Sequence, residues 1–306
     1  MKKIKIAGLS AGLAASSIWG GLYVASKIVL DVVPPFTLLT IRLVIAALIL
    51  GVILASKKWR GFSRKEAMNV FGIGVLGYGI SLGLQFVGTR LSTAANGAVI
   101  TSATPSFIFL FAPWILGEKN TPRKIAALAL SSIGVLLVLN IQELQLKSDL
   151  FLGNVSLLGA GLTWGLYSVL IRKVTKNLRT LPVSFVAFLG GLIVSLPAAY
   201  WEVNSIGIGE ISSEILWGIF YISVVATAVG AYLWNLAFEL LDAGLASLTF
   251  FAQPVFGTIF GVLILGERIT PIFITGGIMI GLGLILAAEN ADRSINDDQE
   301  TNEVTR

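Results

Sequence analysis

The chain has 306 residues, 55% of them hydrophobic and only 13% charged, and its mean hydropathy is +0.86. Because soluble domains usually carry about 25% charged residues, this composition predicts an all-α polytopic membrane protein. The chain contains neither Cys nor His, which excludes disulfides, thiol chemistry, imidazole bases and the usual zinc sites, so we expect no metal and no cofactor. The net charge of +5 resides mainly in short loops, which indicates membrane topology rather than binding to nucleic acid.

Apolar segments of about 20 residues, the length that crosses a bilayer, recur along the whole chain. We expect ten transmembrane helices, at about 6–27, 36–55, 67–89, 93–116, 122–140, 151–171, 182–201, 215–238, 243–265 and 271–288. The segment 140–150 separates two halves of five spans each. The polar and acidic residues 289–306 are expected to form a disordered cytoplasmic tail.

One stretch of the chain occurs twice. The sequence PSFIFLFAPWILGEKNTP at 105–122 corresponds without a gap to PVFGTIFGVLILGERITP at 254–271. Each copy predicts an apolar helix that contains a proline, ends at Leu-Gly-Glu, and is followed by a new helix after Thr-Pro. The pairs Trp19-Gly20 and Trp164-Gly165 extend the correspondence to the first span of each half. The sequence therefore predicts a duplicated fold.

The duplication and the positive charges predict the same topology. Since five is an odd number of spans, two tandem copies insert in opposite orientations, so residues 1–140 and 151–288 are expected to be inverted five-helix repeats. With a cytoplasmic N-terminus, 17 Lys and Arg residues fall inside and only 4 outside. This bias predicts that both termini are cytoplasmic in a multi-pass protein of the cytoplasmic (inner) membrane.

Acidic side chains are absent from the interiors of the predicted spans. Glu118, Glu239, Asp242 and Glu267 lie at helix ends or boundaries. Proton-coupled carriers often use a buried carboxylate, so the residues do not support proton coupling, although a boundary Glu could still titrate. In an inverted repeat Glu118 and Glu267 lie on opposite membrane faces, where we expect each to cap or salt-bridge a helix corner.

Polar and aromatic side chains predict a substrate cavity. Arg42 is the one clearly intramembrane charge, and it should face a cavity, backbone carbonyls or a ligand carboxylate, unless it snorkels to the outer interface. Other polar and aromatic residues fall on single faces of spans 1, 3 and 6, which must turn toward protein or water. We expect spans 1, 3, 4, 6, 8 and 9 to line the cavity. The alternative is hydrogen bonding between helices together with interfacial anchoring. The predicted contacts are Trp19, Tyr23, Arg42, Tyr78, Gln85, Thr101, Trp164, Tyr167, Asn235 and Gln253.

Two prolines mark predicted helix breaks beside this cavity. Pro105 and Pro254 would leave the carbonyls of Thr101 and Phe250 without helical partners. Corresponding broken helices in two halves indicate a transport site, while a purely structural kink is the alternative. Glycines in the last predicted span, among them Gly276 and Gly283, permit close helix contact within the chain, or at the seam of a homodimer.

The duplicated unit, the two Trp-Gly pairs, Arg42 and the repeated Leu-Gly-Glu-x-x-Thr-Pro corner resemble the EamA-like branch of the drug/metabolite transporter superfamily. The resemblance covers the whole chain except the tail. It implies a ten-helix inner-membrane carrier with a central cavity that exports amino acids or other small metabolites. It implies neither a particular substrate nor a driving ion.

A secondary transporter that works by alternating access is therefore the leading hypothesis. A membrane-embedded channel or scaffold is the alternative, but a channel favours a continuous polar lining or charged rings. A membrane enzyme would require clustered acids, His or metal ligands near one interface, which the sequence lacks, so we expect no enzymatic activity.

Overall fold

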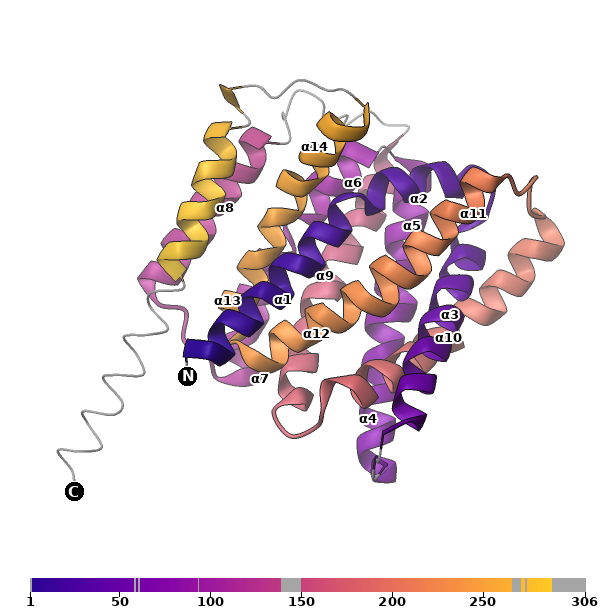
Figure 1. Cartoon of the computed structure of the whole chain (residues 1–306), viewed down its shortest axis with the longest axis horizontal. Helices are drawn as coiled ribbons and strands as arrows, with labels where there is room; N and C mark the ends of the chain where they lie inside the picture. The colour runs from indigo at the N-terminus through magenta and orange to yellow at the C-terminus, as the bar shows by residue number, and fades with distance from the viewer. Residues whose placement is uncertain are drawn as a thin grey trace.

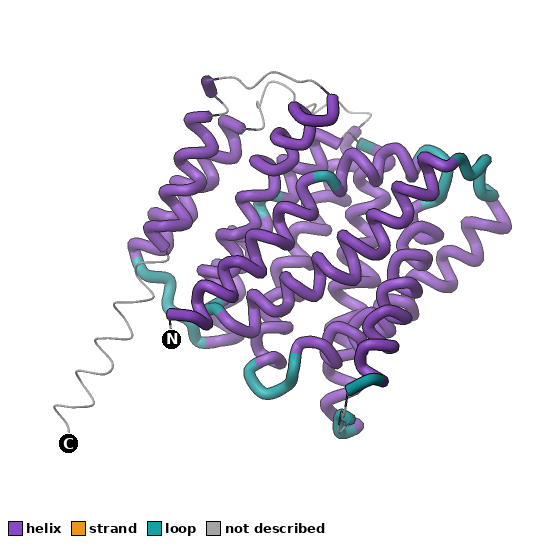
Figure 2. Tube along the Cα trace, viewed as in Figure 1, coloured by secondary structure: helices purple, strands orange, loops and turns teal. Residues whose placement is uncertain are grey.

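The computed structural model describes residues 2–57, 59, 61–92, 94–138, 150–265, 271–272 and 274–287. Within these ranges every regular element is a helix, and Figure 2 draws each of them in the helix colour, purple. The tail 289–306, most of the connection 140–150 and Glu267 lie outside the described residues.

The first half of the chain contains eight helical segments among the described residues. They are α1 (Lys2–Gly20), α2 (Leu22–Leu30), α3 (Pro35–Ala55), α4 (Arg64–Gly74), α5 (Leu82–Leu91), α6 (Ala94–Thr101), α7 (Thr104–Leu116) and α8 (Pro122–Val138), with the π-helical turn η1 (Val75–Ser81) joining α4 to α5. The second half repeats this order. It contains α9 (Phe151–Thr175), α10 (Thr180–Ser205), α11 (Ser213–Phe220), the π-helical η4 (Tyr221–Val229), α12 (Gly230–Leu240), α13 (Ala243–Leu248), the 3₁₀ turn η5 (Thr249–Phe251), α14 (Ala252–Leu265) and a final helix, Ile274–Ala287.

Within the described part of the chain, six continuous helical stretches are long and apolar enough to cross a membrane. They are Lys3–Leu30, Pro35–Ala55, Arg64–Leu91, Phe151–Thr175, Thr180–Ser205 and Ser213–Leu240. Shorter apolar helices lie at Thr104–Leu116, Ala243–Gly257 and Ile274–Ala287. Large apolar side chains such as Leu48 and Val52 are exposed on the outside of the bundle, at 63% and 71% of their surface. The chain is therefore a helical, multi-pass membrane protein.

The two halves of the chain interlock. Helix α1 packs chiefly against α12 and α14 of the second half, and α9 packs chiefly against α5 and α7 of the first half. Figure 1 shows α1 lying alongside α12 and α14. The final helix packs against α8, where a Cβ on Gly134 would lie 2.7 Å from the carbonyl oxygen of Gly276. Because each half inserts its first helix into the other, residues from both halves meet at the centre of the bundle.

The helix breaks lie just before the repeated prolines rather than at them. Helix α6 ends at Thr101 and α7 begins at Thr104, so Pro105 lies in the first turn of α7. In the second half η5 ends at Phe251, and Pro254 lies in the first turn of α14. The expectation that Pro105 and Pro254 lie in helix interiors is therefore corrected, although α7 does contain Pro113 in its interior. Proline has no amide hydrogen, and the first turn of a helix does not use one, so the residue fits best at a helix start.

Glu202 is a second correction, because sequence analysis placed it outside the span 182–201. It lies within α10 and is 5% exposed. Its carboxylate accepts hydrogen bonds from the backbone amides of Phe36 and Thr37 at 3.1 and 2.8 Å, and from the Thr37 hydroxyl at 3.0 Å. A carboxylate at the start of a helix satisfies amides that have no partner within the helix. Glu202 therefore joins α10 to the N-terminus of α3.

Candidate functional site

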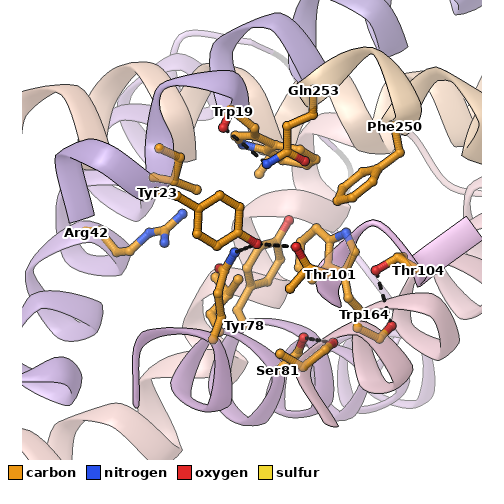
Figure 3. A pocket seen from close by; sticks show the side chains of 16 residues that line it. Trp19, Tyr23, Arg42, Tyr78, Ser81, Thr101, Thr104, Trp164, Phe250 and Gln253 are labelled. Atoms are coloured by element: carbon orange, nitrogen blue, oxygen red, sulfur yellow. Dashed lines mark hydrogen bonds between the residues drawn. The ribbon is translucent and has the colours of Figure 1, made fainter. Parts of the chain in front are cut away.

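A pocket lies between the two halves, and Figure 3 shows the side chains that surround it. Eight of the ten contacts predicted from the sequence line it: Trp19, Tyr23, Arg42, Tyr78, Gln85, Thr101, Trp164 and Gln253. The other lining residues are Leu22, Ser81, Leu82, Thr104, Ala160, Gly161, Ala231 and Phe250. Most of these are small or apolar, so they carried no polar signal in the sequence. The lining that the structure describes includes no carboxylate.

Tyr167 and Asn235, the remaining two predicted contacts, lie behind the pocket wall. The Tyr167 hydroxyl is 2.8 Å from the Tyr78 hydroxyl and 2.9 Å from Asn235 Oδ1. Asn235 Nδ2 donates to the Ser184 hydroxyl at 2.9 Å. All four side chains are fully buried. Tyr167 and Asn235 therefore hold Tyr78 in place and do not line the pocket.

A short chain of hydrogen bonds crosses the pocket from α2 to α5 and α6. The Tyr23 hydroxyl lies 2.5 Å from Thr101 Oγ1, and Gln85 Nε2 donates to the Tyr23 hydroxyl at 2.9 Å (Figure 3). On the opposite side Gln253 Nε2 donates to the carbonyl of Trp19 at 3.2 Å. The Oε1 atoms of Gln85 and Gln253 are both buried without a hydrogen-bond partner. The pocket walls thus hold two unused acceptors.

Arg42 is buried, with 2% of its surface exposed. Its Nε donates to the hydroxyl of Thr227 at 2.7 Å, and its Cζ lies 5.0 Å from the centre of the Phe86 ring. Its Nη1 is buried and has no hydrogen-bond partner in the part of the chain that the structure describes. The side chain therefore turns into the protein and does not snorkel to the membrane surface. A buried guanidinium that lacks a carboxylate partner is costly in free energy unless a ligand completes it.

Aromatic rings line the pocket and pack behind its wall. The centres of the Trp19 and Trp164 rings are 5.9 Å apart, and Trp164 stacks on Tyr167 at 4.7 Å. Trp234, which sequence analysis did not single out, lies 5.4 Å from Trp19 and is fully buried. The indole N–H of Trp19 donates to the carbonyl of Ala226 at 2.9 Å. Such an arrangement of apolar walls with a few polar groups is typical of sites for small molecules.

The described residues contain no group of three or more His, Cys, Asp or Glu side chains that could hold a metal ion. The chemistry that the pocket offers is therefore that of one buried cation, two amide oxygens, several hydroxyls and broad aromatic faces. These groups are suited to binding a polar, partly apolar molecule.

Comparison with known proteins places these features in a family. The chain is 23% identical over 281 residues to the uncharacterized transporter YoaV of Bacillus subtilis (strain 168), which covers 90% of this chain and 94% of the relative. It is 27% identical over 278 residues to an uncharacterized transporter of Archaeoglobus fulgidus, covering 88% of this chain and 93% of the relative. A crystal structure of a protein with 19% identity matches with a TM-score of 0.77, covering 94% of this chain and 98% of that chain, which shows a shared fold.

The model of the EamA-like transporter family matches residues 6–140 and, separately, residues 151–288. These two matches span both halves of the chain, including every described residue that lines the pocket. Membership in a transporter family implies a small-molecule substrate and a place in the membrane, and it argues against an enzyme. The chain belongs to the EamA-like transporter family.

Proposed function

We propose that this protein is a secondary transporter that exports small zwitterionic metabolites, such as amino acids, across the inner membrane by alternating access. The observation that carries the proposal is Arg42, a buried cation with a free Nη1 in the wall of a pocket that also holds free amide oxygens. A substrate carboxylate would complete the hydrogen bonding of the guanidinium. Charged residues at membrane depth are expensive and generally mark a substrate pathway.

The rest of the pocket supports a zwitterion with an apolar side chain. Gln85 Oε1 and Gln253 Oε1 can accept hydrogen bonds from an ammonium group, and the rings of Trp19 and Trp164 offer faces for a cation. Leu22, Leu82 and Phe250 supply apolar contact area. Because polar groups of both signs line one small pocket, a molecule carrying only one charge would leave part of the pocket unpaired.

For the architecture we propose two inverted five-helix repeats, residues 1–140 and 151–288, with ten crossings and both termini in the cytoplasm. The bias of Lys and Arg supports this topology. The same order of helices in the two halves, with a π-helical turn in each, supports the repeat. Reporter fusions after residues Asp31 and Asn204 should report the outside, and a fusion after Lys176 the inside. An inside signal at Asn204 would contradict the topology of the second half.

The transport proposal is tested by reconstituting the purified protein in liposomes. A screen of radiolabelled amino acids and small metabolites, with and without a pH gradient, should find saturable transport that is accelerated by substrate on the opposite side. Arg42→Gln should abolish the transport of carboxylate-bearing substrates. The control Leu48→Ala, at an exposed outer position, should transport normally. Single-channel currents, or a lack of countertransport for every transported compound, would favour the channel instead.

The position of the pocket is tested by thiol chemistry, because the chain contains no Cys. Single Cys residues in place of Trp19, Gln85 and Gln253 should react with a water-soluble thiol reagent, and substrate should protect them. A Cys in place of Leu48, which faces outward, should not react under the same conditions. Inertness at all three pocket positions would mean that these side chains serve only helix packing.

A further inference from the structure

We infer that Thr227 is the positioning residue that orients Arg42 toward the substrate's carboxylate, and that the wide turn η4 gives Thr227 this role. The inference rests on the proposed function of the pocket. Thr227 does not line the pocket, and it lies in the second half of the chain, whereas Arg42 lies in α3 of the first half.

The geometry of η4 determines which way the Thr227 hydroxyl points. Thr227 Oγ1 donates to the carbonyl of Ile222, five residues earlier, at 2.6 Å. A hydroxyl has a single hydrogen, so once this hydrogen is committed to Ile222 the oxygen can only accept. Arg42 Nε, 2.7 Å away, supplies the matching N–H. The wide turn thus presents an oriented acceptor to a side chain that can only donate.

The bond to Thr227 decides which part of the guanidinium faces the ligand. With Nε held by Thr227 and Cζ lying 5.0 Å from the centre of the Phe86 ring, the plane of the group is fixed. Nη1 is then left without a hydrogen-bond partner among the described residues. Fixing a guanidinium in advance reduces the entropy that a carboxylate must remove when it binds. A Val at position 227 keeps the shape of Thr but accepts no hydrogen bond.

The same turn also holds the second large residue of the pocket. The carbonyl of Ala226, the neighbour of Thr227, accepts the indole N–H of Trp19 at 2.9 Å. Two adjacent residues of η4 therefore orient Arg42 and Trp19, which both belong to the first half. A π-helical turn alters the regular backbone bonding of a helix, which makes such carbonyl contacts available, and these turns are frequent at functional sites.

The test compares Thr227→Val with Thr227→Ser, which keeps the hydroxyl, and with Ser223→Ala. Ser223 is a matched control because it lies in the same turn, is fully buried, and has a hydroxyl without a partner. The first readout needs no substrate. In protein labelled with ¹⁵N-arginine, the Nε–H signal of Arg42, assigned by its loss in Arg42→Lys, should be protected from exchange in the wild type, Thr227→Ser and Ser223→Ala. It should exchange rapidly in Thr227→Val.

The second readout uses phenylalanine and its decarboxylated analogue phenethylamine as probes in proteoliposomes. Thr227→Val should raise the KM for phenylalanine about tenfold or more, as expected for losing a hydrogen bond to a charged group, without a comparable change for phenethylamine. Thr227→Ser should restore the wild-type KM. Equal effects on both probes, or an unchanged KM, would overturn the inference by showing that Thr227 only joins two helices.

The two readouts separate this inference from the proposed function. If the wild type transports neither phenylalanine nor any other amino acid, the proposed substrate class is wrong. The exchange of the Arg42 Nε–H would still decide between a fixed and a free guanidinium, and rapid exchange in the wild type would overturn the inference.

Discussion

Lys27 and Arg172 occupy corresponding positions in the two halves, since each follows its Trp-Gly pair by the same number of residues. The Lys27 end of the molecule is held by neutral groups. Lys27 Nζ donates to the carbonyls of Thr89, Arg90 and Ser92 at 3.2, 3.1 and 2.9 Å. These carbonyls lie at the C-terminus of α5, where they lack partners within the helix and a cation is favoured.

At the Arg172 end a cation again caps carbonyls at the C-terminus of a helix, here α12. Arg172 Nη1 donates to the carbonyls of Phe238 and Glu239 at 3.0 and 2.6 Å. This end also includes a carboxylate, since Glu118 Oε1 lies 3.9 Å from Arg172 Nε. Glu118 Oε2 also accepts from the backbone amide of Ala243 at 2.9 Å, at the start of α13. This end therefore ties the corner between α7 and α8 to the second half.

At both ends a cation caps carbonyls at the C-terminus of a helix. Among the described residues, a carboxylate, that of Glu118, takes part only at the Arg172 end. Burial of the Glu118 carboxyl, together with repulsion from Asp242, raises its pKa above the ordinary range, and the amide of Ala243, Lys124 and Arg172 only partly offset this. We therefore expect stability at the Arg172 end to change with pH through the Glu118 carboxyl.

The largest effect is expected from removing the two cations. Arg172→Ala should destabilise the protein by about 2–4 kcal/mol, because two carbonyls lose a charged donor and Glu118 loses its cation. Lys27→Ala should cost less, since it removes the donor from neutral carbonyls and leaves no carboxylate without its cation. Thermal unfolding in detergent measures both, with Arg172→Lys and Lys27→Arg as conservative controls. Equal losses in the two Ala variants would show that Glu118 adds nothing to the Arg172 end.

Two glycines, Gly153 and Gly8, allow the tightness of helix packing at the same two ends to be compared. A Cβ on Gly153 would lie 2.8 Å from the backbone carbonyl carbon of Leu91, at the Lys27 end. A Cβ on Gly8 would lie 2.6 Å from Leu241 Cγ, in a side chain that can move, at the Arg172 end. Gly153→Ala should therefore cost about 1–3 kcal/mol, and Gly8→Ala less. The reverse order of unfolding temperatures would mean that the Leu241 side chain cannot adjust.

The pH response of the Arg172 end is tested with Glu118→Gln. Because the folded pKa of Glu118 is raised, its stabilising contribution is present below the ordinary pKa of about 4.3 and is lost as pH rises through the folded value. Gln cannot ionise but still accepts from Ala243. The variant should therefore match the wild type at low pH and unfold at a higher temperature at neutral pH. It should also retain measurable transport. A variant that is less stable at neutral pH would contradict this.

The smallest effect is expected at the ion pair between Lys124 and Asp242. Their charged atoms are 2.7 Å apart, but both side chains are partly exposed, at 12% and 26%. Asp242→Asn should cost at most about 1 kcal/mol, because Asn still accepts from the amide of Leu245 and caps α13. Asp242→Ala, which also loses the cap, should cost more. Equal unfolding temperatures for the Asn and Ala variants would show that the cap contributes nothing.

Much of the pocket could be predicted from the sequence because its signals are local. Hydropathy shows where the chain can cross a membrane, and the gap-free repeat marks corresponding breaks in the two halves. Polar and aromatic residues at helical spacing identify inward faces, since lipid cannot satisfy them. This is why eight of the ten predicted contacts, among them Arg42, Gln85 and Gln253, line the same pocket.

Only the tertiary structure decided which residues hold those contacts in place. Thr227 carries no special signal in the sequence, and its role arises because η4 packs against α3 and turns its hydroxyl toward Arg42. Trp234 and Ser184 likewise gain their roles from neighbours in other helices. Composition and periodicity report how each residue relates to lipid and to its own helix. Hydrogen bonds between residues far apart in the chain depend on how helices pack, which no local pattern encodes.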